Sequence, residues 1–193
     1  MENRFVDIHT HRTTGDVLTP LSYGIHPWDA ATGCFDPAQA AAAEVIGEIG
    51  LDFACMVDRA VQERCFTAQL AAAERLAKPV VLHCVRAFEP TMLLLARYRL
   101  RAVIFHGFTG SPQQAARAAA AGCYLSFGLR TPRSPRTVEA LAATPPDRLF
   151  LETDTASVPV AEVYAMAAAV RGCTVEALRL QLLHNYLTLF SIR

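Results

Sequence analysis

The chain has 193 residues, of which 52% are apolar and 19% charged, and its formal net charge is zero. This composition excludes a disordered chain, and the length suffices for a sizeable hydrophobic core. The balanced charge provides no global field that would attract nucleic acid or a membrane surface. We therefore expect a single domain over residues 1–193, with no obligate protein partner.

The sequence also bears on the compartment in which the protein works. No stretch reaches the roughly 18 consecutive apolar residues that a membrane-spanning helix needs. Residues 1–4 lack the basic and apolar regions of a signal peptide. The six cysteines show no CxxC pairing, and most stand in apolar surroundings, so we expect reduced, mainly buried thiols. These features predict a cytoplasmic protein without membrane association.

The first expected element is a short buried strand at residues 5–6 that leads into DIHTH at residues 7–11. Because side chains alternate along a strand, Asp7, His9 and His11 should point to the same side. Two imidazoles on one face can bind one metal ion, and a carboxylate beside them can fix the tautomer of a ligand. The alternative is two ordinary histidines near the N-terminus, and the HxH motif alone does not decide between these readings.

A polar stretch follows, and YGIHPW at residues 23–28 then ends another short strand. Only 14 residues separate His11 from His26. That is too few for a helix and two strands, because a parallel crossover alone needs about a dozen residues. Residues 12–22 are also poor helix formers, so we expect a loop followed by one short strand. His26 then either contacts substrate or only orients the turn at Pro27.

From Asp36 onward, apolar runs alternate with segments of helical periodicity. The strands are expected at 45–51, 80–83, 102–106, 123–127 and 149–154. The helices are expected at 37–43, 59–77, 90–99, from 112 to Gly122, from 135, at 160–171 and at 174–190. This order is typical of a parallel sheet with helices outside it.

Nitrogen and oxygen donors recur at or near the carboxyl ends of these strands. Besides His9 and His11, they are Glu48, His83, His106 and Asp154. A carboxylate inside an apolar strand is costly unless it is paired or binds metal, and the carboxyl ends of the strands form the active-site face of a parallel barrel. The donor types favour two divalent cations, magnesium, manganese or zinc, over a thiolate site.

The alternative to metal binding, that these residues have only a structural role, has a different weight for each residue. A single histidine at a strand end is more often a satisfied polar residue than a ligand. Four of six histidines in such positions, together with two acids in buried strands, are harder to assign to chance. Of the remaining two histidines, His26 ends a short strand before Pro27, and His184 lies among leucines on the last helix, where we interpret it as structural.

Eight segments resemble, in order, the TatD family of metal-dependent hydrolases. They are DIHTH at 7–11, GIHPW at 24–28, IGEIGLDF at 46–53, VLHC at 81–84, FHGFTG at 105–110, YLSFG at 124–128, LFLETD at 149–154 and NYLTLF at 185–190. Gln62, Phe66 and Gln69 match the helix that follows GEIGLD. The resemblance implies an α/β fold, a TIM-type (βα) barrel of the amidohydrolase kind with outer helices. Because of the short segment before His26, we expect a distorted barrel with seven main parallel strands.

The resemblance also implies a role for each donor. The first metal ion would be held by His9, His11 and Asp154, the second by His83 and His106, and Glu48 would bridge the two. A water activated by the metals would be the nucleophile, with Asp154 accepting its proton. Glu152 would touch substrate or a further metal, or would instead face the helix layer.

The departures from the family pattern concern the substrate-binding periphery. Arg86 lies one residue later than the arginine that usually follows HC, and we expect it to contact a phosphate. Residues 54–56 and 155–157 replace an arginine and an aromatic-proline segment. Arg130, Arg133 and Arg136 form either a local phosphate-binding patch or an ordinary solvated loop.

Three functions remain open at this point. The leading one is hydrolysis of phosphodiester bonds in DNA or nucleotides, as in the deoxyribonucleases of the family. The same kind of site can polarise a carbonyl, so a small ester, amide or lactone is an alternative substrate. A non-catalytic metal-binding homologue is the third, because fold does not fix function, although the retained ligands argue against it.

Overall fold

The computed structural model describes residues 4–12 and 16–190. These residues form two compact units, one drawn from residues 1–19 and 106–193 and the other from residues 20–105. The prediction of a single domain over residues 1–193 stays a prediction. Residues 1–3, part of the segment expected to lack the features of a signal peptide, lie outside the described residues. Residues 13–15, part of the expected loop, also lie outside them.

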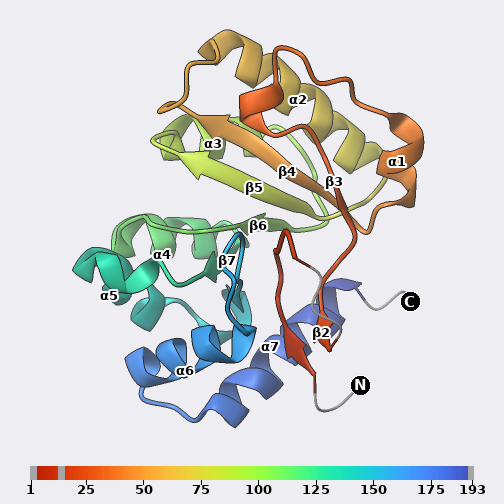
Figure 1. The fold of residues 1–193 in the computed structure, drawn as a ribbon. Helices are drawn as coiled ribbons and strands as arrows, with labels where there is room; N and C mark the ends of the chain where they lie inside the picture. Colours follow the sequence, from red (N-terminus) through yellow and green to blue (C-terminus); the bar gives the residue numbers. More distant parts are fainter. Residues whose placement is uncertain (1–3, 13–15, 191–193) are drawn as a thin grey trace. The chain divides into compact units, whose positions relative to one another are not determined.

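The unit of residues 20–105 is built on a parallel sheet with the strand order β3-β4-β5-β6. The strands are β3 (Ser22–Tyr23), β4 (Val45–Asp52), β5 (Val80–Val85) and β6 (Val103–Phe105). The helices are η1 (Pro27–Asp29), α1 (Pro37–Ala42), α2 (Arg59–Arg75) and α3 (Phe88–Leu95). Helix α2 packs along β4 and α3 packs on β5 (Figure 1). Ile49, Leu82 and Phe66 are fully buried between these layers.

The other unit combines the N-terminal strands with the last part of the chain. Its strands are β1 (Phe5–Val6), β2 (Val17–Leu18), β7 (Tyr124–Phe127) and β8 (Leu149–Leu151). Its helices are α4 (Pro112–Ala120), η2 (Thr131–Arg133), α5 (Pro135–Ala143), η3 (Pro146–Arg148), α6 (Val160–Arg171) and α7 (Val175–Phe190). Strand β1 pairs with β2 and β7 pairs with β8, both in parallel.

Past β1, the chain runs beside the end of β8. The amide of Ile8 donates to the carbonyl of Leu151 at 3.1 Å, and Thr10 forms an isolated parallel bridge with Asp154. Two segments that are about 140 residues apart in sequence are thereby held next to each other. This pairing sets the DIHTH segment against the LETD segment.

The elements expected from the sequence are confirmed, apart from small shifts at their ends. Three of these helices have N-caps: Asp36, Ser111 and Ser134 each accept a hydrogen bond from the first turn of the helix that follows. Helix α3 begins at Phe88 and not at Pro90. A proline at the third helical position is tolerated, because the amides of the first turn have no intrahelical partner.

The segment between His11 and His26 differs from the expectation of one short strand. Two strands of two residues each, β2 and β3, lie there, so that the described residues contain eight strands where seven main strands were expected. Pro20 lies between them and has no amide hydrogen to donate to a sheet. The chain therefore makes two separate pairings, β2 with β1 and β3 with β4. As expected, the described residues of this segment form no helix.

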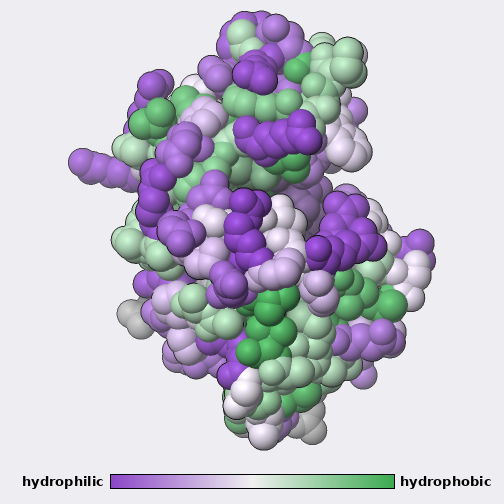
Figure 2. Space-filling view, turned by 90° about the vertical axis from the view of Figure 1, so that its left-hand side faces the viewer, coloured by the Kyte–Doolittle hydropathy of each residue, from purple (hydrophilic) through white to green (hydrophobic). Residues whose placement is uncertain are grey.

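The surface is mixed in polarity. Figure 2 shows hydrophilic and hydrophobic residues interspersed on the face that it presents. The large apolar side chains with substantial exposure are Leu21, Trp28, Met56, Leu93, Leu180 and Leu187. Within residues 4–12 and 16–190, no helix has the length and apolar character needed to cross a membrane.

Helix α2 ends in a Schellman motif that is formed by an alanine. The amide of Lys78 donates to the carbonyl of Ala73, and the amide of Ala77 donates to that of Glu74. Ala77 has φ of 51°, in the left-handed region. Helix α4 ends with the same pair of hydrogen bonds, but there the left-handed residue is Gly122. The alanine at 77 is therefore strained where glycine would not be.

We expect Ala77→Gly to stabilise the protein by about 1 kcal/mol. The steric cost of the left-handed conformation for alanine, which glycine does not have, exceeds the additional conformational entropy that glycine loses on folding. Urea denaturation monitored by circular dichroism measures this change. The matched control is Ala71→Gly, at an exposed position inside α2, which should destabilise by about 1 kcal/mol. Equal destabilisation by both variants would contradict the interpretation.

Candidate metal centre

The first group of donors comprises His9, His11 and Asp154. A ligand atom from each lies within 4.8 Å of the others. Asp154 Oδ1 is 3.9 Å from Nε2 of His9 and 3.6 Å from Nε2 of His11. His9 is buried, whereas the side chain of His11 is 54% exposed. The structure thus brings together the three residues predicted to hold the first ion, on a site that is open on the side of His11.

The backbone of Asp154 is fixed by the two histidines that its side chain faces. Its amide donates to the carbonyl of His9 at 3.1 Å, and its own carbonyl accepts from the amide of His11 at 3.1 Å. Asp154 has φ of 53°, a left-handed conformation in which aspartate and asparagine are several-fold enriched. The carboxylate is therefore placed by main-chain bonds that do not depend on its charge.

Asp7 holds the same two segments together from the buried side. Its carboxylate accepts from the amide of Thr153 at 3.0 Å and from the Thr153 hydroxyl at 2.6 Å. Burial raises the pKa of Asp7 to about 6, although the hydrogen bonds from Thr153 lower it. Asp7 was expected to orient a metal-binding histidine, and its hydrogen bonds to Thr153 add a second role, which is to join the DIHTH and LETD segments.

His106 is paired with Glu152 in the same unit. The Nδ1 atom of His106 lies 3.2 Å from Oε1 of Glu152, and the same oxygen accepts from the amide of Gly107 at 2.6 Å. Burial raises the pKa of the Glu152 carboxyl, but His106, through its charge and hydrogen bond, together with His9 and Ser126, lowers it by more, so that the pKa lies below its usual value. Neither sequence-based role of Glu152 describes this arrangement. Glu152 is placed to orient His106, whose Nε2 would then be the candidate ligand atom.

The second group of donors comprises His26, Glu48 and His83, again with ligand atoms within 4.8 Å of one another. Nδ1 of His83 is 3.6 Å from Oε1 of Glu48. The rings of His26 and His83 are in edge contact, with centroids 4.4 Å apart. His26, which was expected to contact substrate, is therefore also placed as a candidate metal ligand.

Asp52 orients His83 as Glu152 orients His106. Its Oδ2 lies 3.2 Å from Nε2 of His83 and accepts from Nε1 of Trp28 at 2.7 Å. Burial raises the pKa of this carboxyl. Hydrogen bonds from Trp28, from the amide of Ala54 and from His83 lower it by more, so that the pKa lies below its usual value. If Nε2 of His83 carries the proton toward Asp52, Nδ1, which faces Glu48, is the ring nitrogen that can bind a cation.

Two buried glutamines of α2 hold the backbone that carries this second group. The side chain of Gln69 accepts from the amide of Ile25 and donates to its carbonyl, directly before His26. Gln62 makes the same paired bonds with the backbone of Asp52. The two glutamines lie seven residues apart and so share one face of the helix. Their agreement with the family pattern now has a physical reason.

Gly50 permits the close approach of β4 to β5 at His83. Its φ is +144°, and a Cβ placed there would lie 2.0 Å from the carbonyl oxygen of His83. No other residue fits without moving the strands apart. The GEIGLD motif therefore supplies three parts of the site. Glu48 is the candidate ligand, Gly50 allows the close contact with β5, and Asp52 is the carboxylate that orients His83.

Sequence reasoning missed Asp52 and Trp28 as site residues. A signal for Asp52 was available, because an acid four residues after Glu48 on one strand shares its face and costs free energy unless paired. Trp28 gave no comparable signal in the sequence.

Some predicted roles stay predictions. Joint binding of one ion by His83 and His106, and bridging by Glu48, involve residues of both units.

Arg86 is exposed with φ of 52°, and its contact with a phosphate is also a prediction. Arg130, Arg133 and Arg136 are exposed at and beside η2. His184 belongs to neither group of donors, but its side chain is exposed on α7 and does not pack among the leucines as expected.

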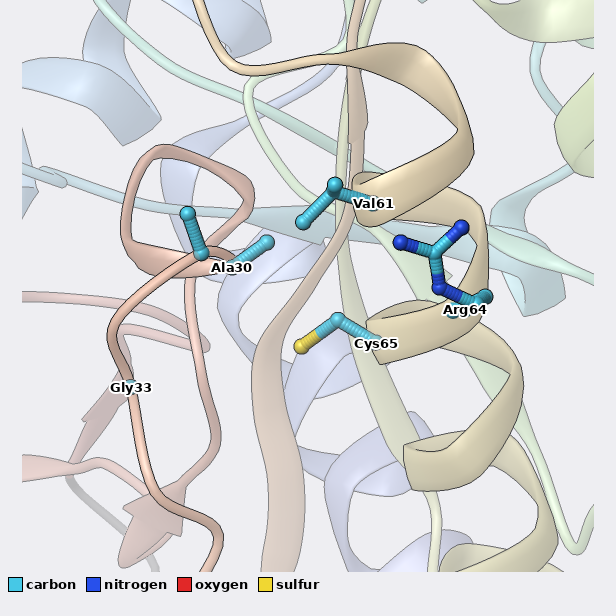
Figure 3. A pocket seen from close by; sticks show the side chains of 6 residues that line it. Ala30, Gly33, Val61, Arg64 and Cys65 are labelled. Atoms are coloured by element: carbon cyan, nitrogen blue, oxygen red, sulfur yellow. The ribbon is translucent and has the colours of Figure 1, made fainter.

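A separate pocket of about 490 Å³ lies in the unit of residues 20–105. Figure 3 shows it between the loop that follows η1 and the start of α2. Its lining residues are Ala30, Ala31, Gly33, Val61, Arg64 and Cys65. None of them was predicted as a site residue, and none belongs to either group of donors.

Both groups suit a divalent cation by their chemistry. Each offers imidazole nitrogen and carboxylate oxygen, the donors of zinc, manganese and related ions. A hydrogen-bonded carboxylate behind a histidine, as at His83, is the usual partner of a metal-binding imidazole. The residues present therefore fit the metal that the sequence predicts.

Comparison with known proteins identifies the family. The family described as TatD related DNase matches residues 12–191. The chain belongs to the TatD family. It is 40% identical over 144 residues to the 3'-5' ssDNA/RNA exonuclease TatD of Cronobacter sakazakii, a match that covers 68% of this chain and 55% of that protein. It is 32% identical over 164 residues to the uncharacterized metal-dependent hydrolase YjjV of Escherichia coli, covering 76% of this chain and 63% of that protein.

Solved structures confirm the fold of this TatD-family chain. The crystal structure of Escherichia coli YjjV aligns with a TM-score of 0.78 at 27% identity, over 94% of this chain and 79% of that chain. A TatD-family hydrolase of Entamoeba histolytica aligns with a TM-score of 0.77 at 13% identity, over 91% of this chain and 75% of that chain, which shows the fold alone. The α/β class with parallel strands and outer helices is thus confirmed. The chain spans about half the length of the TatD exonuclease that it matches.

We expect Asp52→Asn to weaken metal binding by about 10- to 100-fold, because the amide is a poorer acceptor for the proton on His83. Competition of zinc or manganese with a chromophoric chelator measures the affinity. The control is Asp58→Asn, the same change at the N-cap of α2, where asparagine caps equally well. Equal affinity in both variants would remove Asp52 from metal binding.

Proposed function

We propose that the protein is a divalent-metal-dependent hydrolase that cleaves phosphodiester bonds at a two-metal site. The observation that carries the proposal is the repeated pairing of a metal-binding histidine with a buried carboxylate, His83 with Asp52 and His106 with Glu152. A metal-binding histidine almost always donates the N–H of its second ring nitrogen to a carboxylate, a carbonyl or water, and such a carboxylate is present behind both histidines. Membership of the TatD family supports the same conclusion.

In this proposal His9, His11 and Asp154 would hold one cation, and His26, Glu48 and His83 would hold the second. Bound divalent cations lower the pKa of a water molecule and neutralise charge that develops on a phosphoryl group. Asp154 takes the proton from the attacking water. Its Oδ1 lies 3.9 Å from Nε2 of His9 and 3.6 Å from Nε2 of His11, so the carboxylate is beside the position where these residues would hold the cation.

The proposed substrate is single-stranded nucleic acid. Two observations favour it over a small ester. The TatD relatives are named as exonucleases of single-stranded DNA and RNA, and the arginines at 86, 130, 133 and 136 are exposed and available to phosphate. The six cysteines are free thiols, but only Cys123 is buried, so the expectation of mainly buried thiols was wrong. Free thiols are in keeping with the cytoplasmic location that we propose.

We expect the protein to shorten single-stranded DNA when magnesium, manganese or zinc is present. EDTA should abolish this activity and lower the melting temperature, because a cation bound only by the native state stabilises it. Gel analysis of an end-labelled oligonucleotide and thermal unfolding measure the two effects. Elemental analysis of the purified protein gives the identity and number of the ions.

The outcomes separate the proposal from its alternatives. Cleavage of a p-nitrophenyl ester without cleavage of the oligonucleotide would support hydrolysis of a small substrate instead. Metal-dependent stability without any hydrolysis would support a binding protein. Insensitivity of both activity and stability to EDTA would contradict the metal site itself.

We expect Asp154→Asn to reduce turnover by more than about a hundredfold, because asparagine neither accepts the proton nor binds the cation as well. The fold should survive, since asparagine also adopts the left-handed conformation and the main-chain bonds of residue 154 are kept. Turnover of the oligonucleotide and circular dichroism measure both.

The control is His184→Gln, which changes an exposed histidine on α7. It should leave both turnover and stability at the level of the unaltered protein. If Asp154→Asn turned over substrate as fast as this control, Asp154 would have no part in the reaction.

A further inference from the structure

Trp28 is the single tryptophan of the chain, and it is 60% exposed. One exposed aromatic residue is not unusual by itself. Most exposed side chains, however, are free to change rotamer, and the indole of Trp28 is not. Its Nε1 donates to Oδ2 of Asp52 at 2.7 Å, the same oxygen that lies 3.2 Å from His83.

Further contacts fix the direction of the ring. The amide of Trp28 donates to Nδ1 of His26 at 3.2 Å. The indole meets the His26 ring edge-on, with centroids 4.6 Å apart and planes at 83°. Its centroid is 6.0 Å from that of His83, at 72°. The exposed indole is thus held beside two candidate metal ligands.

This combination suits a stacking surface. A hydrogen bond to Asp52 alone would not require most of the indole to remain in water, since a smaller buried donor could supply it. A rigid aromatic face gives contact area with little loss of conformational entropy. Bases of single-stranded nucleic acid stack on such faces with little dependence on sequence, because every base has a π-face. Duplex bases are already stacked on one another.

We propose that Trp28 stacks on a nucleobase of the substrate and so selects single-stranded nucleic acid and positions it at the second group of donors. The inference rests on the proposed function. It makes Trp28 a substrate-binding residue in addition to its role as a hydrogen-bond donor to Asp52. The chain carries no other tryptophan, so its intrinsic fluorescence reports on this one side chain.

The binding experiment measures that fluorescence in the Asp154→Asn variant with magnesium present, so that the substrate is not consumed. We expect a thymidine oligonucleotide to quench the emission in a saturable manner. An abasic oligonucleotide of the same length carries the same phosphates without bases. We expect it to leave the emission unchanged at the same concentrations.

The kinetic experiment compares Trp28→Ala and Trp28→Phe with the unaltered protein on both oligonucleotides. Trp28→Ala should raise KM for the thymidine substrate by about tenfold, the effect of losing one stacked base, and should leave KM for the abasic substrate unchanged. Trp28→Phe keeps a ring but loses the bond to Asp52. It should retain most of the affinity for the thymidine substrate.

Equal losses on both substrates, confined to kcat and present in both variants, would show that Trp28 acts only through Asp52 and His83, and would overturn the stacking role. Hydrolysis of both substrates with the same KM and no quenching would also overturn it, while leaving the phosphodiesterase function intact. Failure of the unaltered protein to bind or cleave either oligonucleotide would overturn the proposed function and this inference together.

Discussion

The site depends on one constraint, that a carboxylate buried in an apolar sheet needs a partner. In the unit of residues 20–105 the partner of Asp52 is His83, and in the other unit the partner of Glu152 is His106. Each pairing stabilises the acid and at the same time decides which nitrogen of the imidazole carries the proton. The same interaction therefore serves both the fold and the chemistry, and neither partner can be changed without affecting both.

The surrounding structure keeps these pairs in place through hydrogen bonds to the backbone. Gln62 and Gln69 bind the main chain beside the second group of donors, and Asp7 binds Thr153 beside the first. All three side chains are buried, where a hydrogen bond is strong and an unmade one is costly. A metal site needs its ligands held to within a fraction of an ångström, and buried amides and carboxylates provide that rigidity better than apolar packing alone.

The elements of the fold could be predicted because their signals are local. Apolar runs, N-cap residues and Gly122 each act within a few residues, and strands β4, β5, β7 and β8 lie where these signals placed them. The partners inside the site could not be predicted in the same way. The role of Glu152 depends on His106, which is 46 residues away. The side chain of His184 was expected to pack among the leucines that are next to it in sequence, but it is exposed. Leu182, Leu183, Tyr186 and Leu189 are buried, and this spacing turns residue 184 outward.

The shortened segment before His26 shows which parts of such a site are needed. Between His11 and His26 the described residues have only the two short strands β2 and β3. Side chains tie these short strands to their units: the Thr19 hydroxyl donates to the carbonyl of Asp7, and Glu44 accepts from the amide of Leu21. Strands that carry ligands depend on sheet pairing, whereas a covering helix adds mainly buried area. A helix in this segment is therefore not needed to keep the donors in place, and in our proposal substrate selection depends on side chains at the site itself, such as Trp28.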